Sequence, residues 1–261
     1  MQLRRVSLAV CFLLLVVSGT VAYAQDPSLI ALKNAYKRSL DEYRVKEDLF
    51  FVASQQYNAL KTLAAQEEAV RAAREVMQVR ADTMLSYYQA LQASLDATPG
   101  VELSRKAAFT NQLALFVETI KAHRSRLEIA TDRLVIEREA NFFESLEPQA
   151  LLNAYQGLSL LKIGQLQTSL DRLGVVKEQV DNAIANNTSM SETTRTEKER
   201  GSAEVARSIQ TAMDQLKGTI GQFDKDLSHT DASSFHQIQS KLSVTYGVLT
   251  QGVEFLQELA R

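Results

Sequence analysis

The strongest constraint on the fold is a long interval without helix-breaking residues. Between Pro27 and Pro99 lie about 70 residues with neither glycine nor proline. Asp26 before Pro27 is a typical helix start, since a capping side chain is followed by proline in the first turn. A continuous helix of this length would extend about 105 Å at 1.5 Å per residue. We therefore expect an elongated protein.

Composition and spacing both favour an all-α fold. The 261 residues include only 10 glycines, 3 prolines and no tryptophan, while 45% are apolar. So few turn residues exclude an all-β fold. Apolar residues recur at alternating spacings of three and four, as in Met77, Ala81 and Met84, which is the heptad spacing of packed helices.

Four signals divide the chain into helical segments. Thr98-Pro99-Gly100 ends the first segment, a second runs to about Glu147, and Pro148 kinks or reverses the chain. Polar turns are expected at residues 186–189 and 230–231. Asn186 and Asn187 also begin overlapping glycosylation sequons, which matter only in a host that modifies them.

Matching apolar stripes predicts the register of neighbouring helices, since facing positions of an antiparallel pair have numbers with a constant sum. A sum near 199 across residues 98–100 pairs Ile120 with Val79 and Arg124 with Glu75. Sums of 379 and 462 across the later turns pair Leu216 of the fourth segment with both Ile163 and Tyr246. Because the sum of 199 continues past Pro148, it favours a kink there.

These registers predict an elongated antiparallel helical bundle with a long coiled-coil hairpin. Residues 25–57 and 148–261 form a four-helix bundle. Residues 58–147 form the hairpin, with its tip near 98–100. Residues 1–24 precede both parts.

The first 24 residues have the features of a signal peptide. Arg4 and Arg5 precede an apolar run, and Ala22-Tyr23-Ala24 fits a cleavage site. We expect Sec-type export to the periplasm or the exterior, with an uncleaved anchor as the alternative. No later stretch approaches a membrane span, so the body is expected to be soluble.

The remaining residues exclude several classes of chemistry. Cys11 is the only cysteine, so the mature chain would have neither disulfides nor thiolate catalysis. Without Arg4 and Arg5, 27 basic residues face 31 acidic ones, a net charge of −4 that does not favour nucleic acid. No catalytic, metal or cofactor motif is present, and we expect no enzyme activity, metal or cofactor.

More apolar side chains lie near the expected hairpin tip than two helices can bury. We expect them to form an exposed patch that binds a partner. The alternative is burial by self-association or by folding back of the hairpin. The residues are Met84, Tyr87, Tyr88, Leu91, Leu95, Phe109, Leu113 and Phe116.

The sequence thus favours an exported, non-enzymatic helical scaffold or interaction protein that binds a protein partner, or itself, through the hairpin. One alternative is an extracytoplasmic, sensor-like bundle that binds a small ligand between helices. A further alternative is a membrane-acting or client-holding helical protein. Membrane contact is expected only through an uncleaved N-terminal segment or the apolar hairpin tip.

Overall fold

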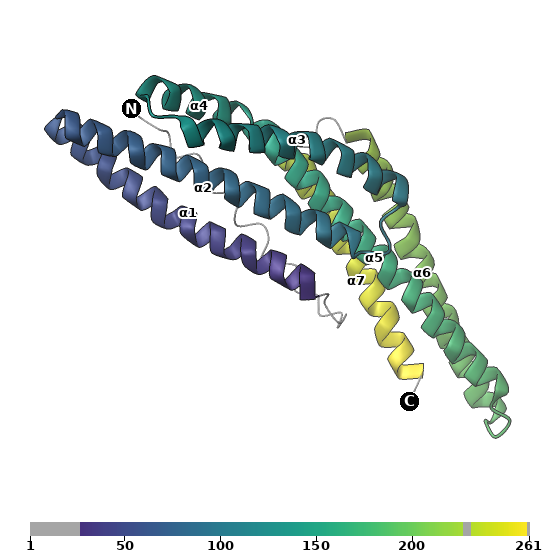
Figure 1. Cartoon of the computed structure of the whole chain (residues 1–261). Helices are drawn as coiled ribbons and strands as arrows, with labels where there is room; N and C mark the ends of the chain where they lie inside the picture. The colour runs from purple at the N-terminus through teal and green to yellow at the C-terminus, as the bar shows by residue number, and fades with distance from the viewer. Residues whose placement is uncertain (1–26, 227–230, 260–261) are drawn as a thin grey trace. The chain divides into compact units, whose positions relative to one another are not determined.

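A computed structural model describes residues 27–226 and 231–259, which form seven α-helices and no strand (Figure 1). The all-α prediction is confirmed. The expected signal peptide, residues 1–24, lies outside the described residues. None of the helices in the described ranges has the length and hydrophobicity of a membrane span. The helices are α1 (Pro27–Leu60), α2 (Leu63–Asp96), α3 (Leu103–Ile129), α4 (Arg133–Ser145), α5 (Glu147–Asn186), α6 (Glu192–Asp226) and α7 (Ala232–Leu259).

Two compact units make up the described chain. Unit 1 contains residues 27–94 and 108–154, and unit 2 contains residues 95–107 and 155–259. This grouping differs from the expected one, which placed residues 25–57 with residues 148–261. The difference comes from an unexpected reversal in the first long helical segment.

The chain reverses at Lys61 and Thr62, where a continuous helix was expected. Lys61 takes the left-handed conformation with a φ of 50°, and its amide donates to Tyr57 O at 2.9 Å. Thr62 then starts α2, because its hydroxyl accepts a bond from Ala65 N at 3.3 Å. Lysine occupies a position where glycine is usual, at a cost of about 1 kcal/mol. A search for glycine and proline therefore misses this turn.

The reversal packs α1 antiparallel to α2 within unit 1. Thr83 Oγ1 donates to Ser39 O at 2.9 Å, and Lys46 Nζ donates to Glu75 Oε2 at 2.8 Å. Residue numbers increase along α1 from Ser39 to Lys46 while those of their partners on α2 decrease from Thr83 to Glu75, so the two helices are antiparallel. Residues 27–60 thus belong with α2.

The hairpin expected across residues 98–100 is present, with α2 antiparallel to α3, but its register differs. Arg124 Nε donates to Asp82 Oδ1 at 3.0 Å, whereas the expected partner was Glu75. Asp82 lies one heptad from Glu75. Because a shift of one heptad brings an equivalent seam position opposite α3, the apolar pattern alone does not distinguish the two registers.

A second unexpected break separates α3 from α4. Asp132 has extended backbone angles, with φ −90° and ψ 139°, and its side chain caps α4 by accepting from Leu134 N at 2.7 Å. The helix then folds back, which brings Glu139 of α4 to His123 of α3. The reversal expected as an alternative at Pro148 thus occurs at residues 130–132.

Pro148 bends the chain and does not reverse it. Leu146, the single residue between α4 and α5, keeps right-handed helical angles with φ −82° and ψ −13°. Its carbonyl accepts from Ala150 N at 2.9 Å, so helical hydrogen bonding continues across the junction. Tyr88 of α2 donates to Ala150 O at 2.8 Å and holds the start of α5.

In unit 2, the rest of α5 packs with α6 and α7 in up-down-up order. Ser202 of α6 donates to Asp181 of α5, and Lys241 of α7 donates to Gln222 of α6. These pairs agree with the antiparallel turns expected near residues 187 and 231.

Candidate partner-binding surface

Seven of the eight side chains expected to form an exposed patch are buried. Tyr88 is 1% exposed, and its ring meets Phe116 edge-on at a centroid distance of 5.6 Å. Burial raises the pKa of the Tyr88 phenol well above its usual value. Met84 is partly buried. The seven buried side chains are Tyr87, Tyr88, Leu91, Leu95, Phe109, Leu113 and Phe116.

Folding back of the chain accounts for the contacts of Tyr87 with Tyr36 and of Tyr88 with Ala150 within unit 1, whereas Leu95 belongs to unit 2. The unexpected turn before α4 adds a third helical layer to the hairpin of α2 and α3, and the start of α5 supplies the carbonyl that Tyr88 binds. The expected exposed patch is therefore wrong at these positions. A surface that binds a partner must be formed by other side chains, which remain exposed.

One such region is the end of the α1–α2 hairpin, residues 49–66, which we call the hairpin end. Lys61 carries the only charge in this stretch. Phe51, Leu60 and Leu63 are 56%, 65% and 71% exposed. Exposed apolar side chains in a region depleted of charge are typical of surfaces that bind other proteins.

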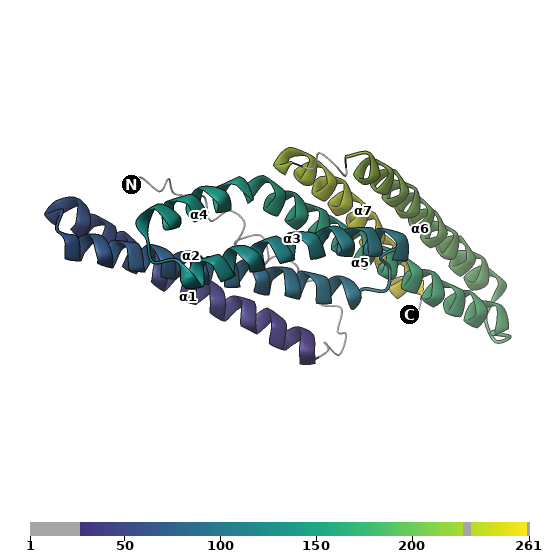
Figure 2. The ribbon, with the colours of Figure 1, turned by 45° about the horizontal axis from the view of Figure 1, so that its top comes forward.

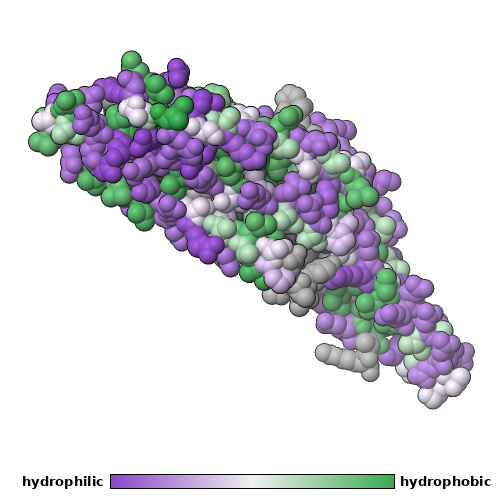
Figure 3. Space-filling view, in the orientation of Figure 1, coloured by the Kyte–Doolittle hydropathy of each residue, from purple (hydrophilic) through white to green (hydrophobic). Residues whose placement is uncertain are grey.

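The turn between α3 and α4 lies toward the same end of unit 1 (Figures 1 and 2). Ile129 and Leu134, on either side of this turn, are 83% and 73% exposed. The space-filling view shows apolar side chains, in green, among hydrophilic ones at this end (Figure 3). The two turns together present large apolar groups to solvent.

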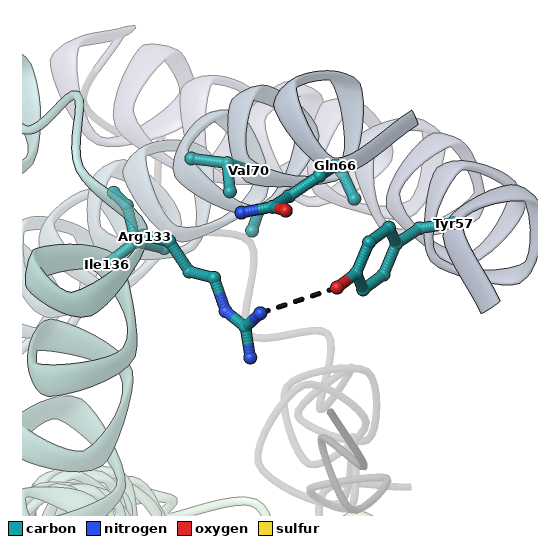
Figure 4. Close-up of a pocket in the computed structure, with 7 residues that line it drawn as sticks. Tyr57, Gln66, Val70, Arg133 and Ile136 are labelled. Carbon is teal, nitrogen blue, oxygen red and sulfur yellow. Dashed lines mark hydrogen bonds between the residues drawn. The ribbon is translucent and has the colours of Figure 1, made fainter. Parts of the chain in front are cut away.

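A small pocket with a cavity volume of about 20 Å³ lies between the hairpin end and α4 (Figure 4). Arg133 and Tyr57 point toward each other there, and Arg133 Nη1 donates to the Tyr57 hydroxyl at 3.4 Å. Arg133 Nε also donates to Glu137 Oε1 at 2.9 Å. The pocket is lined by Tyr57, Gln66, Ala69, Val70, Ala73, Arg133 and Ile136.

The alanines of α2 leave the space for this pocket. Ala69 and Ala73 are one turn apart on the helix, and their methyl groups are small. Ala73 and Ile136 belong to a buried apolar cluster between the helices of unit 1. The pocket thus has an apolar wall, and its volume admits about a methyl group from a partner's side chain.

A buried polar pair holds α4, and with it Arg133 and Ile136, against α3. His123 Nδ1 lies 2.9 Å from Glu139 Oε2, and Arg126 Nε donates to both carboxylate oxygens at 2.9 and 3.0 Å. His123 is fully buried, and its Nε2 has no hydrogen-bond partner.

The environment shifts the pKa values of both His123 and Glu139. Burial lowers the pKa of His123, although the hydrogen bond to Glu139 acts in the opposite direction. Burial alone would raise the pKa of Glu139, but the hydrogen bonds from Arg126 and His123 lower it. We infer that the neutral imidazole donates from Nδ1 to an ionised carboxylate. The sequence shows His123 only as a histidine among basic residues and carries no signal for this pairing.

Unit 2 contains a shallower groove between α6 and α7. Lys198 Nζ donates across it to Leu259 O at 2.6 Å, and Phe255 lies in its wall. Within residues 27–226 and 231–259, no three His, Cys, Asp or Glu side chains gather in a way that could hold a metal ion. The pocket at the hairpin end is the more enclosed of the two, and we take it as the candidate site.

Comparisons with known proteins return no relative. No protein family, no curated protein and no solved structure matches this chain.

Proposed function

We propose that this protein is an exported helical interaction protein, without catalysis of its own, that binds a protein partner through the hairpin end. The observation that carries the proposal is the pocket beside Arg133, which opens at the end of unit 1 where large apolar side chains are exposed. A small hollow with exposed apolar side chains around it offers a partner both a point of insertion and further contact area.

A protein partner fits this region better than a small ligand. Small-molecule sites bury most of the ligand and converge several polar groups on it. Here the wall is mostly apolar, and the guanidinium of Arg133 is already held by Glu137 and Tyr57. Exposed groups such as Leu63 and Leu134 extend the apolar area beyond the pocket.

Export is part of the proposal and has its own support and test. Arg4 and Arg5, the apolar run and Ala22-Tyr23-Ala24 support cleavage after Ala24. The mass of the protein isolated from its host should correspond to a chain that begins at Gln25. A mass that includes Met1 through Ala24 would contradict cleavage and favour an anchor.

Site-specific photo-crosslinking in the producing cells tests the partner site. A photoreactive phenylalanine analogue replaces Leu63 or Leu134 at the candidate surface, and Val244 of α7 serves as the control because it is 59% exposed. We expect Leu63 and Leu134 to give the same protein adduct, and Val244 to lack it. Adducts that do not depend on position, or none at the hairpin end, would contradict the proposal.

A pocket-filling variant sharpens this test. Ala69→Phe places a ring in the pocket from its α2 wall and should abolish the adduct formed at Leu134. Ala183→Phe, at an exposed position of α5 outside the hairpin end, is the control. If both variants keep the adduct, the pocket does not hold the partner.

A further inference from the structure

Helix α1 carries two apolar stripes, of which unit 1 buries only one. Tyr36 and Leu40 are buried. Val45, Leu49 and Val52 are 58%, 52% and 50% exposed. At 100° per residue these three side chains fall within an arc of about 60°, on the opposite side of the helix from Tyr36 and Leu40. We call this second stripe the outer face.

The outer face has the spacing of a coiled-coil seam. Val45, Leu49 and Val52 are separated by four and three residues, and the same alternation continues to Gln56 and Ala59. Such spacing fits another helix lying alongside, because knobs at these positions enter the holes of a facing helix. No charged residue occurs from Leu49 to Leu60, so nothing opposes close approach there.

We propose that the outer face of α1 pairs with the outer face of α1 from a second copy of this chain, as a parallel coiled coil centred on residues 45–59. With Leu49 at an a position, Asp41 is a g residue and Lys46 is the following e residue. In a parallel pair each g side chain faces the e side chain five residues later on the other helix. Asp41 of each copy then meets Lys46 of the other.

Within one chain, Asp41 and Lys46 remain able to make this contact. Asp41 is exposed and contacts Arg44 at 3.2 Å, a surface pair of little energy. Lys46 Nζ donates one bond to Glu75, and an ammonium group has three donors.

Gln56 selects the parallel orientation over the antiparallel one. In the parallel pair Gln56 lies at the same level as its own counterpart, so the two amides donate to and accept from each other. An antiparallel pair in which Leu49 faces Val52 places Gln56 against Val45 and leaves its amide without a partner in the seam. A single polar seam residue commonly sets register and orientation in this way.

The outer face shares no residue with the pocket, although Leu49, Val52, Gln56 and Ala59 also belong to the hairpin end. The two proposals are still distinguishable, because self-association of the isolated chain requires no partner protein. Two measurements on the full chain test the proposed dimer: its molar mass in solution and the crosslinking of introduced cysteines. Sedimentation should give a dimer at micromolar concentration, and Leu49→Asp combined with Val52→Asp should give a monomer. The melting temperature should stay within about 2 °C, since both side chains are half exposed.

Disulfide formation between engineered cysteines reports whether the two α1 helices are parallel or antiparallel. The background variant is Cys11→Ser, which lacks the only native cysteine. Gln56→Cys should form a covalent dimer rapidly on mild oxidation, at least tenfold faster than Asn58→Cys, which is exposed on another side of α1. Equal rates at both positions would overturn the proposal, as would crosslinking only in a mixture of Val45→Cys and Gln56→Cys chains. A protein that stays monomeric also overturns it, whether the outer face then binds another protein or lipid vesicles.

Discussion

His123 Nδ1 lies 2.9 Å from Glu139 Oε2, at a place where solvent reaches neither side chain appreciably. This contact joins α3 to α4, the helix that contributes Arg133 and Ile136 to the pocket. Arg126, which is partly exposed, donates to the same carboxylate, and removing Glu139 would leave the buried Nδ1 of His123 without an acceptor. The pair therefore supports the candidate surface without being part of it.

Glu139→Ala should destabilise the protein by about 1–3 kcal/mol, since the buried Nδ1 donor of His123 loses its acceptor. Glu118→Ala is the control on α3, because Glu118 pairs with Lys121 in full exposure to solvent, and it should change stability by less than about 1 kcal/mol. Urea unfolding of both variants measures the difference. Equal effects would mean that the buried contact does not hold α4.

Stability should fall on acidification below pH 6.5. Burial lowers the folded-state pKa of His123 below its unfolded value, and the charges of Arg80 on α2 and Arg126 on α3 act in the same direction, against Glu139 on α4. A group with a lowered folded pKa takes up protons preferentially when unfolded. The contribution of His123 to the free energy of unfolding is therefore present above pH 6.5 and is lost as the pH falls toward its folded-state pKa.

The control for this pH dependence is His123→Gln, which cannot titrate. Its stability should change less than that of the wild type between pH 6.5 and 5. Glu139 also has a lowered pKa, held down mainly by Arg126 against the effect of burial, so its contribution is lost only below about pH 4.5. Parallel stability curves for wild type and His123→Gln above pH 5 would contradict the role of His123.

Lys61→Gly should stabilise the protein by about 0.5–1 kcal/mol. Lys61 has a φ of 50°, a conformation that glycine adopts without strain. Lys61→Ala keeps the strain and should be close to neutral. Thermal unfolding distinguishes the two variants, and a lower melting temperature for the glycine variant would show that the chain does not turn there.

Two glycines of α5 should respond to alanine with opposite signs. A Cβ at Gly164 would lie 2.3 Å from Val101 Cγ2, whereas a Cβ at Gly174 would meet nothing within 4 Å. We expect Gly164→Ala to destabilise by about 2 kcal/mol through overpacking. Gly174→Ala should stabilise by about 0.5–1 kcal/mol because alanine favours a helix interior. Stabilisation at both positions would contradict the close packing around Gly164.

Helix content and the later turns could be predicted because they depend on local signals. Asp231 illustrates this, since its side chain accepts from Ser234 N at 2.8 Å and starts α7 near the expected position. Register was harder to predict. Tyr246, expected in the seam opposite Leu216, is 57% exposed. An apolar stripe wide enough to contact two helices does not specify which of its edges is buried.

The two early reversals escaped prediction for a different reason. Neither Lys61 nor Ala130 is a helix breaker, and the turns at these positions depend on tertiary packing that outweighs a small local strain. Thr62 and Asp132 were the available cap signals. Without these turns the sequence places an exposed apolar surface at residues 84–116, whereas in the structure Tyr87 contacts Tyr36 of α1 and Tyr88 donates to Ala150 of α5.

The hairpin end exists only because the chain turns at Lys61, and one distance decides whether it does. Spin labels at Lys37 and Gln89, both exposed, report the separation by pulsed electron resonance. With α1 packed antiparallel to α2 at the usual spacing of about 8–10 Å between helix axes, we expect a label distance below about 30 Å. A continuous helix would separate the two positions by about 78 Å, and a distance near that value would contradict the hairpin and the binding surface built on it.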